Sequence, residues 1–149
     1  MYADCDTSEH KKYVLSLING EAKPTAVDAE GNGVFHIVDD PRVTPIGRFI
    51  RKYSLDEIPQ LFNVLRDDMS LVGPRPPLPY EAREYDDWQR QRLEVQAGIT
   101  GVWQVNGRNH VSFDEMTFQD LMYGMNRGLW VDVLLCLRTI PAPLLGGGL

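Results

Sequence analysis

Two adjacent acids, Asp56 and Glu57, could do phosphoryl-transfer chemistry. Neighbouring carboxylates can hold Mg²⁺ between phosphate oxygens while one of them attacks phosphorus as a nucleophile. A purely structural role is the alternative, because acids in the first turn of a helix interact favourably with its free amides and its dipole. The residues alone leave both interpretations open.

Basic residues gather around this pair. Residues 41–75 contain six basic and four acidic residues, a local net charge of +2, although the whole chain carries −6. Guanidinium groups grip phosphate oxygens in pairs, so Arg48, Arg51 and Arg75 are candidate anion ligands. Pro74 and Pro76 restrict the backbone around Arg75 and would hold it in one pose. An ordinary solvated face remains the alternative for these arginines.

The composition is that of one ordinary folded domain. The chain has 149 residues, 43% of them hydrophobic and 24% charged. A net charge of −6 and a pI near 5.0 argue against nucleic acid as a partner. The two cysteines, Cys5 and Cys136, suggest neither a disulfide framework nor a zinc site. Any bound anion must therefore be held locally.

The elements that would position these residues are mostly helices. Ser54 and Glu57 have the spacing of a capping box, with apolar residues recurring at helical spacing behind them, and Ser112 with Glu115 repeats the pattern. We expect an α/β (α+β) fold that is helix-rich, with little strand. The predicted helices cover residues 9–18, 56–65, 80–95, 113–125 and 129–140; the predicted strands cover residues 34–38 and 102–105; residues 74–79 are expected to be extended.

Three motifs together resemble the bacterial sugar transferases that are monotopic polyprenyl-phosphate phosphoglycosyl transferases. They are Ser-Leu-Asp-Glu-Ile-Pro-Gln-Leu-Phe-Asn-Val from residue 54, Met-Ser-Leu-Val-Gly-Pro-Arg-Pro from residue 69 and Gly-Ile-Thr-Gly-Val-Trp-Gln-Val-Asn-Gly-Arg from residue 98. The resemblance predicts a catalytic core over residues 39–149. Residues 1–38 are predicted to form a helix followed by a variable loop or hairpin, within one structural domain.

The resemblance implies transfer of a sugar-1-phosphate from a UDP-sugar to a polyprenyl (undecaprenyl) phosphate, with Mg²⁺ as cofactor, in polysaccharide or glycoconjugate biosynthesis. Asp56 would form a phosphoryl-aspartate and release UMP, while Glu57 would help to place the metal or phosphate. Arg51 and Arg75 would contact phosphate or nucleotide, with Arg48 and Arg108 completing the substrate-binding set. The reaction would take place at the cytoplasmic face of the bacterial inner membrane.

The resemblance also implies an apolar helical hairpin, inserted in one membrane leaflet, ahead of the catalytic domain. The first residues here do not match it, so we expect an N-terminally truncated form with an unusually apolar surface where the hairpin would pack. A non-catalytic binding remnant and a soluble nucleotide-sugar hydrolase are the alternatives. The oligomeric state stays open, with a homo-oligomer as one option.

Overall fold

The computed structural model describes residues 8–27, 33–34, 43–106 and 110–139 of the chain. Helices predominate in these ranges and strands are short, which confirms the helix-rich α/β class. The elements, with η1 and η2 as 3-10 helices, are α1 (Ser8–Ile18), β1 (Ala26–Val27), β2 (Gly33–Val34), α2 (Pro45–Lys52), η1 (Leu55–Glu57), α3 (Gln60–Leu65), β3 (Ser70–Val72), α4 (Pro79–Glu84), α5 (Asp87–Arg90), η2 (Gln91–Glu94), β4 (Gly98–Thr100), α6 (Val102–Asn106), α7 (Phe113–Asn126) and α8 (Leu129–Thr139).

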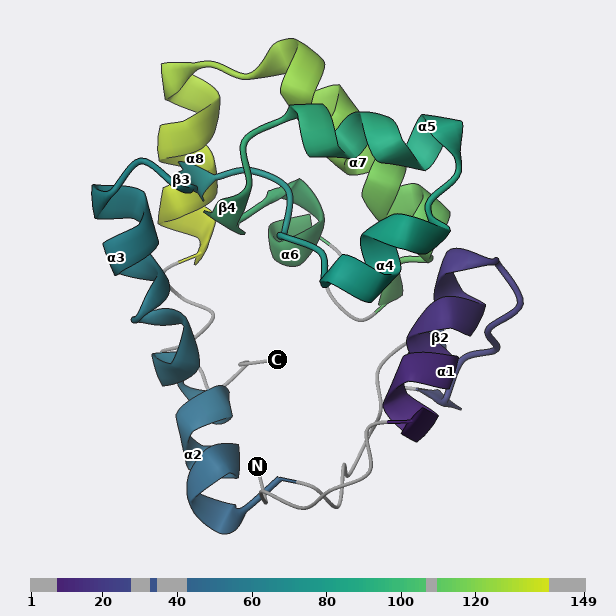
Figure 1. Cartoon of the computed structure of the whole chain (residues 1–149). Helices are drawn as coiled ribbons and strands as arrows, with labels where there is room; N and C mark the ends of the chain where they lie inside the picture. The colour runs from purple at the N-terminus through teal and green to yellow at the C-terminus, as the bar shows by residue number, and fades with distance from the viewer. Residues whose placement is uncertain (1–7, 28–32, 35–42, 107–109, 140–149) are drawn as a thin grey trace.

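A small parallel sheet organises the larger part of the molecule. Strand β3 pairs with β4 in the register that sets Val72 opposite Thr100. Helix α8 packs against both strands, and α7 lies nearby (Figure 1). The buried side chains of Val72, Tyr123 and Leu135 form the core cluster. The core therefore joins the sheet to the two C-terminal helices.

Glycines allow these two strands to continue into closely packed turns. A Cβ atom built on Gly98 would clash with the main-chain nitrogen of Gly73 and the carbonyl carbon of Val72. A Cβ on Gly73 would clash with the main-chain oxygen of Gln96 in the same way. This close approach holds the start of the extended segment 74–78, which contains Arg75 and leads into α4.

Helices α2, η1 and α3 form an arm (residues 45–65) along one side of the molecule, shown in blue to teal in Figure 1. It begins where the Thr44 Oγ1 atom accepts a hydrogen bond from the Gly47 amide at 3.0 Å. Large apolar side chains of the arm are exposed, with exposed fractions from 37% to 83%: Ile46, Phe49, Tyr53, Leu55, Ile58, Leu61, Phe62 and Leu65. Helix α8 also exposes large apolar side chains, among them Leu129 at 76% and Trp130 at 83%, so the described residues do not single out one surface for the expected hairpin.

Across the described ranges, none of the helices combines the length and the apolar content that a membrane crossing requires.

The helix predicted over residues 80–95 is wrong, because the structure divides it into α4, α5 and η2. The break falls at Tyr85, whose backbone is extended and whose side chain is buried. Asp86 then starts α5 with a capping box: its carboxylate accepts from the Gln89 amide at 2.9 Å, and the Gln89 side chain accepts from the Asp86 amide at 3.1 Å. The local capping interaction and the burial of Tyr85 outweigh the helical propensity of the stretch.

The strand predicted over residues 102–105 is also wrong. These residues lie in α6, and the strand of this region is β4, immediately before it. The β4 segment is only three residues long, so its apolar alternation was too short to be distinguished from the helical segment that follows. Of the strand predicted over residues 34–38, Val34 lies in β2, and residues 35–38 are outside the described ranges.

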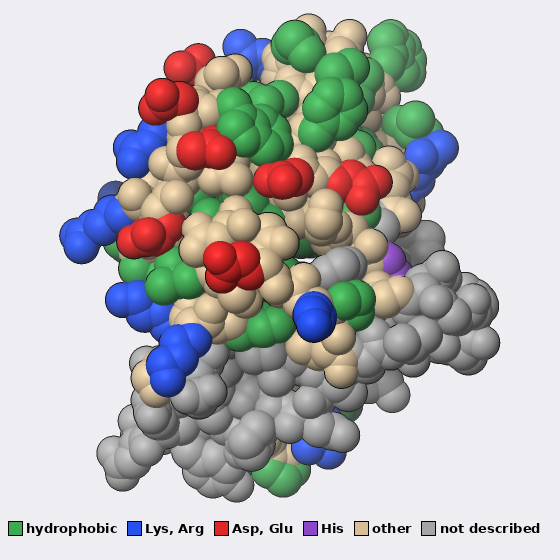
Figure 2. All heavy atoms as spheres, turned by 90° about the vertical axis from the view of Figure 1, so that its right-hand side faces the viewer, with side chains coloured by type: hydrophobic (Ala, Val, Ile, Leu, Met, Phe, Trp, Pro, Cys, Tyr) green, Lys and Arg blue, Asp and Glu red, His purple; other side chains and the backbone are tan. Residues whose placement is uncertain are grey.

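Helix α7 starts as expected, with the Ser112 side chain accepting from the Glu115 amide at 3.3 Å. Its buried residues are Thr117, Asp120 and Tyr123, whereas Met125 near its end is 73% exposed. Helix α8 confirms the last predicted helix, although Ile140 lies outside the described ranges. Figure 2 shows the face that carries α1, α4 and α5, where acidic and basic side chains are interspersed.

Candidate active site

The two acids lie in η1, a single 3-10 turn between α2 and α3. Asp56 is exposed, and Glu57 is half-buried. The Glu57 Oε2 atom accepts a 2.6 Å hydrogen bond from the Gln60 side-chain amide. One carboxylate of the pair is therefore open to a ligand, while the other is oriented by a neighbouring helix.

The capping box predicted at Ser54 does not form. The Ser54 side chain makes no capping hydrogen bond, and its backbone is left-handed with φ of 51°. Pro59 is the residue that precedes α3, so the helix begins at Gln60, later than predicted. Proline has no amide hydrogen and its ring clashes with the carbonyl four residues before it, which excludes a continuous helix through the acids. The acids thus lie one turn ahead of α3 rather than inside its first turn.

The predicted arginines come from different parts of the fold. Arg48 is exposed and Arg51 half-buried on α2, and Arg75 is exposed in the segment between β3 and α4. Arg51 belongs to the same local unit as the acids, because the Ser54 amide donates to the Arg51 carbonyl at 3.0 Å. Arg108 lies outside the described residues.

The structure does not join these arginines to the acids by direct contacts. Within residues 43–106, neither Asp56 nor Glu57 forms an ion pair with Arg48, Arg51 or Arg75. A bound polyphosphate would therefore have to occupy the space between the acids and the guanidinium groups if all of them act on one ligand. Local sequence placed Arg51 near the acids, whereas the position of Arg75 depends on β3 and the turn after it.

The carboxylates of Asp56 and Glu57 suit Mg²⁺ when a substrate supplies the remaining ligands. Among the described residues, no group of three or more His, Cys, Asp or Glu side chains could enclose a metal ion. Asp56 and Glu57 supply carboxylate oxygens from one turn. Because Mg²⁺ is commonly held by one or two carboxylates together with substrate phosphates and water, the pair fits a metal that arrives with a phosphorylated substrate.

Sequence reasoning missed an apolar pocket of about 480 Å³ between α3 and α8. It shares four residues, Ser70, Val72, Gln96 and Asp132, with a smaller, more polar pocket of about 200 Å³. Neither pocket has the acids or the predicted arginines in its lining. No motif marks this region, because its lining comes from segments that are adjacent only in the folded chain.

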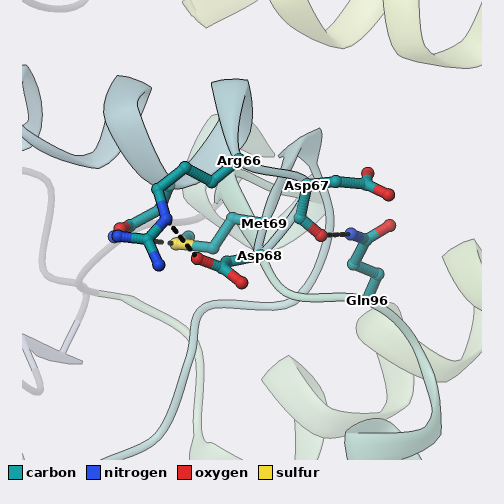
Figure 3. Close-up of polar contacts among 6 residues, drawn as sticks. Arg66, Asp67, Asp68, Met69 and Gln96 are labelled. Carbon is teal, nitrogen blue, oxygen red and sulfur yellow. Dashed lines mark hydrogen bonds and ion pairs between the residues drawn. The ribbon is translucent and has the colours of Figure 1, made fainter.

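Sequence reasoning also missed Gln96, which contacts the end of α3. Its side-chain Nε2 donates to the Asp67 carbonyl at 3.0 Å, as Figure 3 shows. The same turn holds the exposed Arg66–Asp68 ion pair, with 3.2 Å between Nε and Oδ2. A lone glutamine 29 positions from its partner carries no signal in the sequence.

Comparison with known proteins agrees with the resemblance noted from the motifs. The family model described as "Bacterial sugar transferase" matches residues 17–146. The chain is 48% identical over 116 residues to the galactosyl transferase CpsE of Streptococcus agalactiae, covering 77% of this chain and 26% of that protein. It is 50% identical over 111 residues to the undecaprenyl-phosphate galactose phosphotransferase of Salmonella typhimurium, covering 74% and 23%.

A shorter relative is matched over a larger share of its length. The chain is 46% identical over 110 residues to the exopolysaccharide production protein ExoY of Sinorhizobium fredii, covering 74% of this chain and 49% of that protein. The chain thus spans about a quarter to a half of the curated relatives it matches. The match over residues 17–146 includes the acids, α3 and the Arg75 segment, and the chain belongs to the bacterial sugar transferase family.

Proposed function

We propose that this chain is the catalytic part of an enzyme that transfers a sugar-1-phosphate from a UDP-sugar to a polyprenyl phosphate. The observation that carries the proposal is the arrangement of Asp56 and Glu57 in one turn, with Asp56 exposed and Glu57 oriented by Gln60. The names of the relatives, which include undecaprenyl-phosphate sugar phosphotransferases, support the class of reaction.

In the proposed reaction an Asp56 carboxylate oxygen attacks the phosphorus that carries the sugar. The bond from this phosphorus to the oxygen that bridges the two phosphates breaks, and UMP leaves with the electron pair. The sugar phosphate is then held on Asp56 as an acyl phosphate. An oxygen of the polyprenyl phosphate next attacks the same phosphorus, the bond to Asp56 breaks, and polyprenyl-diphosphate-sugar forms.

Charge neutralisation is the main task of the remaining residues. Glu57 would hold Mg²⁺ together with Asp56, and the metal would supply positive charge at the phosphates. We assign Arg51 and Arg75, with Arg48 and Arg108, to phosphate or nucleotide contacts. Phosphoryl transfer depends chiefly on positioning and on stabilisation of charge, which a carboxylate pair and nearby guanidinium groups provide.

We place the reaction at a membrane surface, the cytoplasmic face of the bacterial inner membrane. A polyprenyl acceptor resides in the bilayer, and the arm that carries the acids exposes Phe62 at 69% and Leu65 at 83%. Exposed apolar patches of this kind mark sites of interaction with proteins or lipids. The acceptor would then reach Asp56 from the lipid side.

The test is UMP release by wild-type chain and an Asp56→Asn variant, measured with a panel of UDP-sugars, Mg²⁺ and undecaprenyl phosphate in detergent. Wild type should release about one UMP per chain without the lipid and turn over with it. We expect Asp56→Asn to lose roughly 10³-fold or more in both reactions, because the amide is not a nucleophile. Asp87→Asn, an exposed acid on α5, is the matched control and should behave as wild type.

Three outcomes would contradict the proposal. Equal UMP release by wild type and Asp56→Asn would exclude Asp56 as the nucleophile. Binding of UDP-sugar without turnover by wild type would indicate a non-catalytic role. Continuous release of free sugar phosphate without the lipid would indicate a hydrolase.

A further inference from the structure

Apolar packing does little to orient η1, the turn that carries the acids, or α3, the helix that follows it. Neither η1 nor α3 contains a buried residue. Leu61, on α3, is 45% exposed, and Ile58, just before it, is 51% exposed. Elements held by burial of an apolar face normally hide such side chains. The orientation of η1 and α3 must therefore depend strongly on the contacts at the end where α3 joins the sheet.

The end of α3 is a left-handed turn at Asp67, whose φ is 65°. Local backbone bonds close this turn, with the Asp67 amide donating to the Val64 carbonyl at 3.0 Å and the Asp68 amide donating to the Asn63 carbonyl at 2.9 Å. The Asp67 carbonyl instead accepts from the Gln96 side chain, which approaches from the segment before β4 (Figure 3). This bond ties the turn to a part of the chain far away in sequence.

The main chain around Gln96 contacts the Arg75 segment at the same time. A Cβ atom on Gly73 would clash with the Gln96 carbonyl oxygen, so the two backbones touch. Two residues further on, the Gly98 amide donates to the Pro74 carbonyl at 2.9 Å. Residues 96–98 therefore contact the end of α3 through a side chain and the residues before Arg75 through the backbone.

We propose that Gln96 is a positioning residue that sets the arm with Asp56 and Glu57 relative to Arg75. This inference rests on the proposed function, because it takes the acids and Arg75 to act on one ligand. A left-handed turn at a non-glycine residue is strained and persists only where its surroundings hold it. Loss of the amide donor leaves the Asp67 carbonyl without this bond and weakens the hold on the turn, so the arm becomes more mobile.

The experiment compares Gln96→Met, which keeps the length of the side chain but removes the donor, with Gln91→Met as the matched control. Gln91 is exposed on η2, which packs against α5 and α7. In the full 149-residue chain, amide hydrogen exchange of residues 60–69 should become about 2- to 10-fold faster in Gln96→Met, the range for one hydrogen bond. The control should exchange as wild type does.

Kinetics separate a positioning role from a merely structural one. In Gln96→Met the kcat for UMP release should fall about tenfold while the KM for the UDP-sugar stays within about twofold, because misplaced catalytic groups slow the chemical step more than they weaken binding. Faster exchange with unchanged kcat would overturn the positioning role, as would exchange and kcat equal to those of Gln91→Met. Absence of UMP release by wild type would instead overturn the proposed function.

Discussion

Arg92 and Asp120 form an ion pair that is almost fully removed from solvent. The Arg92 Nη2 and Asp120 Oδ2 atoms are 2.6 Å apart, and the two side chains are 5% and 1% exposed. The rings of Tyr85 and Phe113 flank the guanidinium, with 5.9 and 5.6 Å from its carbon to the ring centroids. The pair joins η2 to α7.

Removal of one partner should destabilise the fold strongly. Arg92→Met leaves a carboxylate buried without its counter-charge, and we expect a loss of about 3–5 kcal/mol in the free energy of unfolding. Denaturant titration measures it, and Arg92→Met/Asp120→Leu, which removes both charges, should recover much of the loss. The control is Arg66→Met, whose pair with Asp68 is exposed, and it should change stability by less than about 1 kcal/mol. Similar losses of stability in Arg92→Met and Arg66→Met would contradict the conclusion that the buried ion pair matters more than the exposed one.

Asp120 should also make stability depend on pH. Burial raises the pKa of Asp120 to about 6, and the attraction of Arg92 offsets only part of that shift. The folded state then binds the Asp120 proton more tightly than the unfolded state does. Protonation of Asp120 therefore stabilises the fold below about pH 4, and this stabilisation is lost as the pH rises through about 6. The free energy of unfolding of wild type relative to Asp120→Asn should fall over this interval. A constant difference from pH 4 to 7 would show that Asp120 has an ordinary pKa.

The contact between Gly73 and Gly98 should tolerate no side chain. In Gly98→Ala the new methyl group would overlap the backbone of residues 72 and 73, so β3 and β4 must separate. We expect a loss of about 4 kcal/mol or more, or failure to fold. Gly128→Ala is the control, because nothing lies within 4 Å of its Cβ position, and it should stay within about 0.5 kcal/mol of wild type in thermal unfolding. A stable Gly98→Ala variant would contradict the close approach.

A buried and an exposed leucine should lose very different amounts of stability on substitution by alanine. Leu135 is 5% exposed in the core, and Leu135→Ala should cost about 2–5 kcal/mol. Leu65 is 83% exposed on the arm, so Leu65→Ala should change the free energy of unfolding by less than about 0.5 kcal/mol. Urea titration of both variants checks the contrast. A large loss in Leu65→Ala would mean that the arm is packed in solution.

Sequence patterns predicted elements best where a cap or a sustained apolar run acts within one segment. Ser112 starts α7 as its spacing indicated, and the stretch from Leu129 forms α8. The same kind of pattern failed at Ser54, because Pro59 prevents the helix from starting there and Ser54 turns left-handed. It failed again at Tyr85, because the ring is buried against Phe113, at 5.3 Å between centroids, through contacts that no local pattern contains.

The amino-acid order alone determined the adjacency of Asp56 and Glu57, the basic surroundings, the helical character and, through its motifs, the family. These follow from covalent neighbours and short-range periodicity. Tertiary structure alone decided that Gln96 reaches the end of α3 and that Arg92 meets Asp120. Such relationships join residues far apart in the chain, and they form only when packing of the whole fold brings the segments together.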